Sequence, residues 1–225
     1  RYVPGGLSLA GNRTVEYGML EGNLGYLRLP TFDPNRVLDD IPSVMAALAG
    51  TTGLVLDIRN NNGGELANVA GVVRWFLDST LRWPEGFTRG REIWQDYEPP
   101  IQPVAPASRY ARPVVVLANG ASRSAADMMA ELMRQLPGVT LVGDTTTGIA
   151  CQDHEDIEGD LRLPGGLHIH IPTGCIRGYD GVPVEWFGVA PDLRVPQSEA
   201  DLRAGRDLQL EAAMAVLREK AEGGG

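Results

Sequence analysis

The stretch from Val114 to Leu136 constrains the fold most, because it joins a strand, a tight turn and a helix without a break. Residues 114–118 are apolar and rich in valine, a pattern typical of a strand that is buried on both faces. The apolar residues that follow recur with the spacing of one helix face: Ala125, Met128, Met129, Leu132, Met133 and Leu136. The sequence therefore predicts a buried strand that leads directly into an amphipathic helix.

Two serines, Ser122 and Ser124, lie in the turn between this strand and this helix. A hydroxyl group there is close to free backbone N–H groups and to the positive end of the helix dipole, and both stabilise developing negative charge. A single serine at a helix start is usually only a cap. Here the serines stand among Gly120, Ala121 and Ala125, and this excess of small residues indicates that something approaches the backbone closely.

A second unit of the same kind lies upstream. Residues 53–58 form an apolar run, which is followed by Asn60, Asn61 and Asn62, then by Gly63 and Gly64, and then by a predicted helix over 65–77. A glycine pair in a turn most often supplies a positive φ angle. It can also expose an amide as an oxyanion donor. A phosphate-binding loop is excluded, because its lysine and its glycine spacing are absent.

Strands and helices alternate along the chain, which predicts an α/β fold with a mainly parallel sheet. A predicted hairpin, 161–163 with 167–171, adds antiparallel strands. Residues 83–112 have no clear period and read as a long excursion of the kind that often faces a substrate. The other predicted strands cover 14–20, 23–29, 92–97, 139–142 and 188–195, and the other predicted helices cover 34–49 and 207–221.

Composition narrows the function classes. The chain has 225 residues and a net charge of -9, which argues against nucleic-acid binding because phosphate groups require clustered basic residues. No apolar run is as long as a membrane span, and Arg1 at the start suggests a mature product or an excised fragment. Cys151 and Cys175 could pair, which would indicate an oxidising compartment, or could be two buried free thiols.

Several motifs of the chain resemble those of the S41 peptidases, the family of C-terminal processing (tail-specific) proteases and the tricorn protease core, and they occur in the same order as in that family. The resemblance covers about Gly25 to Leu217 and implies a protease core of the ClpP/crotonase type over 23–225, with 1–22 as a leading segment. Its motifs are Gly25 to Leu29, Leu56 to Gly64, Ala121 to Asp127, Gly143 to Gly148, Gly188 to Asp192, and Gly205 to Asp207.

This resemblance implies roles for individual residues. It places the nucleophile on Ser124, one oxyanion amide on Ala125, and the other on the glycine pair, with Gly63 preferred to Gly64. It implies a peptide or protein substrate and neither a cofactor nor a metal. We expect the amides of Gly63 and Ala125 to face the Ser124 hydroxyl, because turns that follow parallel strands open at the same edge of a sheet.

The general base departs from the family pattern. Processing proteases carry a lysine where this chain has Ile149, and the only lysine, Lys220, belongs to the predicted C-terminal helix, so a Ser–Lys dyad is excluded. The tricorn protease and the nisin resistance protein instead take a histidine from a segment N-terminal to the core, and no histidine precedes Ser124 here. The base therefore lies upstream of Arg1, or it is one of His170, His168 and His154, or the site is inactive.

Glu185 is a further candidate, because a carboxylate can orient a histidine base as the third member of a relay. A solvated acid at a strand end is the simpler interpretation of this residue.

Two functions follow from these observations. The first is a serine peptidase that acts outside the cytoplasm. It is favoured by the position of Ser124 between small residues and by the glycine pair, Gly63 and Gly64, expected opposite. The second is a non-catalytic module that binds a peptide or an apolar ligand, as in the related retinoid-binding repeats, and the loss of the lysine favours it. If Cys151 and Cys175 bridge neighbouring strands, their Cα atoms should lie within about 7 Å.

Overall fold

A central seven-stranded sheet organises the computed structural model, which describes residues 9–11, 14–33, 37–88, 93–94, 98–152 and 160–223. Five strands of this sheet are parallel neighbours, β3, β4, β7, β8 and β13, and β1 and β2 extend it antiparallel beside β3. In spatial order the strands are β1 (Ala10–Gly11), β2 (Glu16–Leu20), β3 (Leu24–Arg28), β4 (Gly53–Asp57), β7 (Val114–Ala118), β8 (Val139–Gly143) and β13 (Leu193–Arg194).

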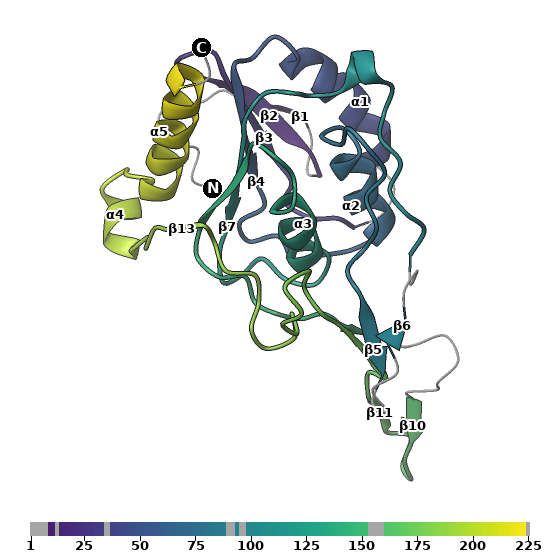
Figure 1. The fold of residues 1–225 in the computed structure, drawn as a ribbon. Coiled ribbons are helices and arrows are strands. Elements are labelled where there is room, and N and C mark those ends of the chain that lie inside the picture. Colours follow the sequence, from purple (N-terminus) through teal and green to yellow (C-terminus); the bar gives the residue numbers. More distant parts are fainter. Residues whose placement is uncertain are drawn as a thin grey trace.

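Helices cover both faces of the sheet, so the chain forms three layers (Figure 1). One face carries α1 (Val37–Leu48), α2 (Leu66–Val73) and α3 (Ala125–Met133), and the other carries α5 (Leu208–Gly223). Every residue of β4 and β7 is buried. This double coverage explains why both strands are continuous apolar runs in the sequence.

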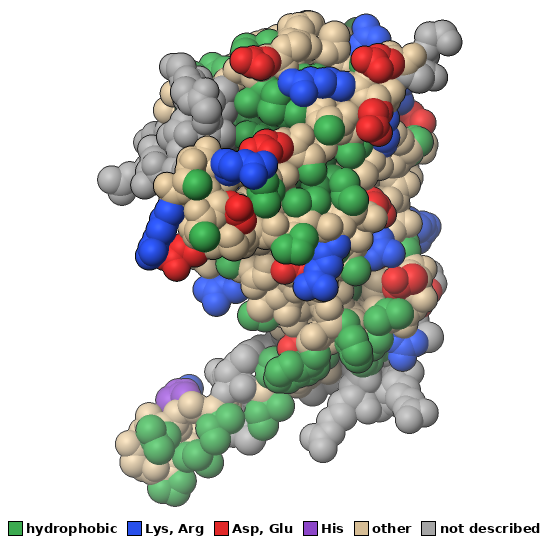
Figure 2. Space-filling view, turned by 90° about the vertical axis from the view of Figure 1, so that its left-hand side faces the viewer, with side chains coloured by type: hydrophobic (Ala, Val, Ile, Leu, Met, Phe, Trp, Pro, Cys, Tyr) green, Lys and Arg blue, Asp and Glu red, His purple; other side chains and the backbone are tan. Residues whose placement is uncertain are grey.

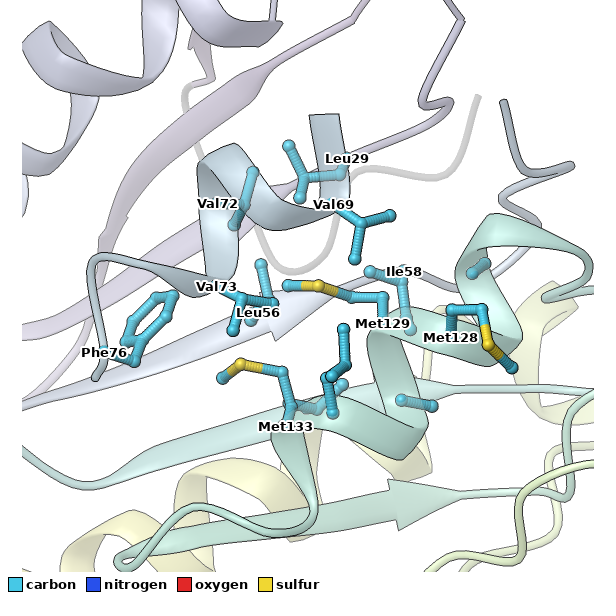
Figure 3. Close-up of a cluster of buried hydrophobic side chains, with 14 of the residues drawn as sticks. Leu29, Leu56, Ile58, Val69, Val72, Val73, Phe76, Met128, Met129 and Met133 are labelled. Carbon is cyan, nitrogen blue, oxygen red and sulfur yellow. The ribbon is translucent and has the colours of Figure 1, made fainter. Parts of the chain in front are cut away.

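The core is divided by the sheet, because successive side chains of a strand point to opposite faces. Leu54 and Leu56 of β4 pack on the α1–α3 side, whereas Val55 packs with Leu210 and Leu217 of α5. Figure 3 shows the larger cluster, in which side chains from α2 and α3 meet above the sheet: Leu29, Leu56, Ile58, Val69, Val72, Val73, Phe76, Met128, Met129 and Met133. This packing fixes where α3 begins.

A smaller antiparallel sheet lies below the core, in the order β6 (Ile93–Trp94), β5 (Gly86–Thr88), β12 (Gly174–Ile176) and β9 (Cys151–Gln152). The hairpin of β10 (Asp160–Arg162) and β11 (His168–His170) projects from it as an arm (Figure 1). Cys151 lies directly opposite Cys175 and forms a disulfide with it, with 3.9 Å between the Cα atoms. The predicted bridge is confirmed, and the free-thiol alternative is wrong.

The structure confirms the α/β class and the mainly parallel sheet, and it corrects several boundaries. The helix expected over 65–77 ends at Val73, and the strand expected over 188–195 is reduced to β13. Gly188, the first residue of that range, has a positive φ angle, which an extended strand does not allow. The short helix α4 (Glu199–Arg203), the 3₁₀ turn Pro106–Ser108 and the strands β5, β9 and β12 were not predicted.

In the part of the chain that the structure describes, no helix is both long enough and apolar enough to cross a membrane.

Candidate active site

The two predicted turns meet at one edge of the sheet. They follow β4 and β7, which are adjacent parallel strands, so their carboxyl ends lie side by side. Hydrogen bonds join the turns: the Arg123 N–H donates to the Asn61 carbonyl (3.0 Å), and the Ser122 hydroxyl donates to the Ile58 carbonyl (2.8 Å). The Ser122 side chain is fully buried. It therefore holds the two turns together and is not accessible to a substrate.

Ser124 occupies the residue immediately before α3, with φ 57° and ψ -120°. This backbone conformation is unfavourable for a residue with a side chain, and such strain concentrates at functional sites. The side chain is half-buried, and among the described residues none forms a hydrogen bond with its hydroxyl. Ser124 thus presents an unengaged hydroxyl group at a helix N-terminus, where the helix dipole favours negative charge.

Gly63 lies directly against Ser124. A Cβ atom on Gly63 would be 2.7 Å from the Ser124 Cβ and 2.8 Å from the Arg123 carbonyl oxygen. The φ angle of Gly63 is +94°, which also favours glycine. Only glycine therefore allows the first turn to approach the second this closely.

The amides near Ser124 are not equivalent. The Ala125 N–H has no hydrogen-bond partner among the described residues, whereas the Gly63 N–H donates to Asn61 Oδ1 at 2.8 Å. Asn61 is fully buried and is anchored by donating to the Leu29 carbonyl. The Gly64 N–H is also unengaged within the described part of the chain. Gly63 thus lies where the sequence predicted it, but its N–H is engaged by Asn61 and is not free.

Asp127 connects the serine turn to the loop after β8. Its fully buried carboxylate accepts the N–H groups of Gly148 (2.9 Å) and Ile149 (3.0 Å). It also accepts the Ser124 N–H and the Thr146 hydroxyl. Burial raises the pKa of Asp127, and these hydrogen bonds oppose the rise because they favour the charged form. Asp127 therefore fixes the backbone of Ser124 relative to the Gly148 loop.

No lysine lies near Ser124. Ile149, at the position of the family's lysine, is 42% exposed and its side chain cannot act as a base. Lys220 donates to the Gly138 carbonyl (3.1 Å) and to Thr140 Oγ1 (2.6 Å) at the amino end of β8. Ser124 follows the opposite, carboxyl end of the parallel strand β7. The sheet therefore separates the only lysine from the serine.

The three histidines belong to the arm or to its connections. His168 is exposed on β11 and is not hydrogen-bonded to Ser124. His154 lies outside the described residues, and so does the side chain of His170. The histidine prediction is therefore settled only for His168, which the structure does not bring to the serine.

Glu185 is held beside the loop that carries Ile149. Its Oε2 atom accepts the N–H groups of Ala150 (2.6 Å) and Cys151 (3.0 Å). Its Oε1 atom has no partner among the described residues. Because Cys151 is bonded to Cys175, the disulfide also anchors the strand that holds Glu185. The carboxylate therefore has a fixed orientation and one oxygen that can accept a further hydrogen bond.

Sequence reasoning missed a buried charged network on the α5 side of the same edge. Arg59 forms ion pairs with Asp57 (2.7 Å) and Asp207 (2.8 Å), and the Tyr26 hydroxyl donates to Asp57 (2.7 Å). Burial alone would raise the pKa of Asp57, but the charge and hydrogen bonds of Arg59 outweigh it and hold this pKa below its ordinary value. The network attaches the end of β4 to the start of α5. The signal in the sequence that could have indicated this network is Asp57, a charged residue at the end of an apolar strand.

Comparisons with known proteins show the family and the fold of the chain. The family model of Peptidase family S41 matches residues 23–195. A carboxyl-terminal-processing protease of Picosynechococcus sp. is 30% identical over 199 residues, which cover 86% of this chain and 45% of that protein. Tricorn protease homolog 1 of Streptomyces coelicolor is 29% identical over 219 residues, which cover 92% of this chain and 18% of that protein. The chain thus spans less than half of the length of these relatives.

Solved structures show the same fold. A putative peptidase from Parabacteroides merdae has a TM-score of 0.78 at 24% identity, over 94% of this chain and 67% of that chain. The tricorn protease has a TM-score of 0.63 at 21% identity, over 88% of this chain and 18% of that chain. At these sequence identities, the similarity to solved structures shows the fold alone.

Proposed function

The chain belongs to peptidase family S41, and on that premise we propose that it is the core of a serine peptidase that cleaves peptides or protein tails through an acyl-enzyme on Ser124. The observation that carries this proposal is the contact between the two turns. Gly63 leaves space against Ser124 that any side chain would fill, and Ser124 is held in a strained conformation at a helix N-terminus. A structural serine cap would require neither feature.

The surrounding amides supply the electrostatic part of the reaction. When the Ser124 hydroxyl attacks a carbonyl, the negative charge on the carbonyl oxygen needs fixed donors nearby. The Ala125 N–H is one such donor. The second donor is Gly63, with Gly64 as the alternative. Since the Gly63 N–H already donates to Asn61 Oδ1, it would form a bifurcated hydrogen bond to Asn61 and the oxyanion. Each donor contributes about 3–4 kcal/mol of stabilisation to the transition state.

The general base in this proposal is a histidine. A serine hydroxyl is a weak nucleophile without an adjacent base, and Ile149 and Lys220 cannot supply one. The candidates are His154 and His170 of this chain, and a histidine from a segment N-terminal to the core.

Glu185 completes the relay in this proposal. Its free Oε1 atom accepts the N–H of the histidine, which fixes the ring and stabilises its protonated form during the reaction. The two backbone amides on Oε2 keep the carboxylate in place, so this role needs no rearrangement of Glu185.

We propose an extracytoplasmic location, which the disulfide supports. Cys151 and Cys175 account for both cysteines of the chain, and disulfides persist mainly in oxidising compartments. The substrate in this proposal is therefore a secreted or periplasmic peptide or protein tail.

One observation favours a second function. Because no described residue activates the Ser124 hydroxyl, the same amide groups could hold a carbonyl group of a bound peptide without its cleavage. The fold would then be a binding module.

Hydrolysis of a library of quenched fluorescent peptides tests the proposal. We expect cleavage by the protein that includes its upstream segment, and loss of cleavage in Ser124→Ala. Ser122→Ala is the comparison variant: it removes a buried hydroxyl that joins the two turns, so it should weaken cleavage without abolishing it at a temperature where the variant is folded. Cleavage that survives Ser124→Ala would refute the assignment.

A further inference from the structure

Two aromatic side chains follow Glu185 and face solvent. Trp186 is 87% exposed and Phe187 is 64% exposed. Trp186 also has a φ angle of +69°, in a region that bulky residues rarely adopt. An exposed tryptophan gains little from folding, and its backbone conformation would suit glycine or asparagine better. The identity of this residue therefore needs an explanation outside the folding of the chain.

The strained turn is tightly packed. The Trp186 N–H donates to the Gly148 carbonyl (2.9 Å), and the Gly188 N–H donates to the Val184 carbonyl (2.9 Å). A Cβ atom on Gly148 would be 2.5 Å from the Gly188 nitrogen, so the turn and the Gly148 loop leave no free space between their backbones. These contacts fix the position of Trp186 while leaving its indole ring exposed.

The same contacts connect Trp186 to the nucleophile. Gly148, which accepts the Trp186 N–H, donates its own N–H to Asp127, and Asp127 accepts the N–H of Ser124. Ile149, the next residue after Gly148, exposes 42% of its surface. We define the apolar ledge as Ile149, Trp186 and Phe187. Figure 2 shows hydrophobic side chains gathered at the lower end of the body, where the arm begins.

We propose that the apolar ledge binds a large apolar side chain of the substrate next to the scissile bond, with Trp186 as its main contact. The inference rests on the proposed function: the Thr147 N–H donates to the Ser122 carbonyl (2.8 Å), which holds the Gly148 loop beside the serine turn, and a peptide whose carbonyl group reaches Ser124 passes this loop. Successive residues of an extended peptide advance by about 3.3 Å, so side chains next to the attacked bond lie close to this loop. The ledge has no charged member, and aromatic rings stack on apolar and aromatic side chains.

A binding measurement tests this proposal without requiring catalysis. Two fluorescently labelled peptides, which differ only in a central Phe-Leu or Ser-Asn pair, are titrated against the Ser124→Ala chain, and binding is followed by anisotropy. We expect the Phe-Leu peptide to bind about tenfold more tightly. Adding Trp186→Gly should abolish this ratio and leave the fold intact, because glycine adopts the φ angle of this position without strain.

Met19→Ala is the matched control, since Met19 is an exposed apolar residue (49%) on β2, outside the ledge. It should leave the ratio unchanged. Equal affinities of the two peptides, no binding of either, or an unchanged ratio in Trp186→Gly would overturn the proposal. A ledge that binds while Ser124 of the active protein fails to react with a fluorophosphonate would refute the catalytic function alone.

Discussion

A methyl group placed on Gly63 would lie 2.7 Å from the Cβ of Ser124. The two residues are 61 positions apart in the sequence, and they meet because β4 and β7 are adjacent parallel strands. This contact brings the backbone of one turn against the Ser124 side chain of the other. The position of Gly63 therefore links the geometry of the sheet to the chemistry proposed for Ser124.

Replacing Gly63 by alanine should disrupt the site. The added methyl group would collide with Ser124 and with the Arg123 carbonyl, and we expect peptide cleavage to fall by about 10²–10³-fold, as when an oxyanion donor is lost. Gly138→Ala is the control, because Gly138 also has a positive φ (+81°) but nothing within 4 Å of its added Cβ. Equal losses in both variants would mean that backbone strain, and not the contact with Ser124, causes the effect.

Alanine substitution should lower the free energy of unfolding at Ser122 but not at Ser124. Ser122→Ala leaves the Asn119 N–H without its partner and removes one of the two hydrogen bonds of the Ile58 carbonyl, which keeps the Asn61 N–H, so the free energy of unfolding should fall by about 1–3 kcal/mol. Ser124→Ala removes no hydrogen bond that its hydroxyl forms with the described residues, and the free energy of unfolding should change by less than about 0.5 kcal/mol. Urea denaturation of both variants measures this. A large loss in Ser124→Ala would show that its hydroxyl is structural.

Glu185→Gln should remove the negative charge of this side chain while keeping its position. The glutamine oxygen can still accept the amides of Ala150 and Cys151, so the thermal midpoint should change little. Cleavage should fall at least about tenfold, because a neutral side chain stabilises a protonated histidine poorly. Glu199→Gln, at an exposed ion pair with Arg203, should leave cleavage unchanged. Full activity in Glu185→Gln would remove this residue from the relay.

Asp57 should contribute to acid sensitivity. Because its pKa is lowered in the folded state, its contribution to stability is present above its ordinary pKa of 3.8 and is lost as the pH falls from there through the folded pKa. Asp57→Asn should cost about 3–5 kcal/mol near neutral pH and should show a shallower loss of stability in acid. Denaturation at several pH values measures both effects. Asp144→Asn, at an exposed pair with Arg194, should cost less than about 1 kcal/mol.

The sequence predicted the parts of the fold whose signals are local. The valine run of β7, the apolar face of α3 and the glycine pair after β4 each follow from the spacing of neighbouring residues, and their meeting follows from parallel pairing. The pairing of the two cysteines could also be predicted, because the chain has only two and a strand-rich segment separates them.

The rest depends on contacts between distant residues. Pairing of Arg59 with Asp207 across 148 positions leaves no periodic signal, and neither do the two amides that hold Glu185. The engagement of the Gly63 N–H by Asn61 depends on the side-chain conformation of a buried amide. The strand expected over 188–195 is shortened at its start, where Gly188 has a positive φ angle and its backbone packs against Thr146 and Gly148.

Covalent labelling of Ser124 tests the central claim most directly. The full-length protein is treated with a fluorophosphonate, and the modified residue is identified by peptide mass spectrometry. We predict a single adduct on Ser124 that is absent in Ser124→Ala and present in Ser122→Ala. A folded protein that carries no adduct on Ser124, or an adduct that persists in Ser124→Ala, would contradict the proposal that this serine is the nucleophile.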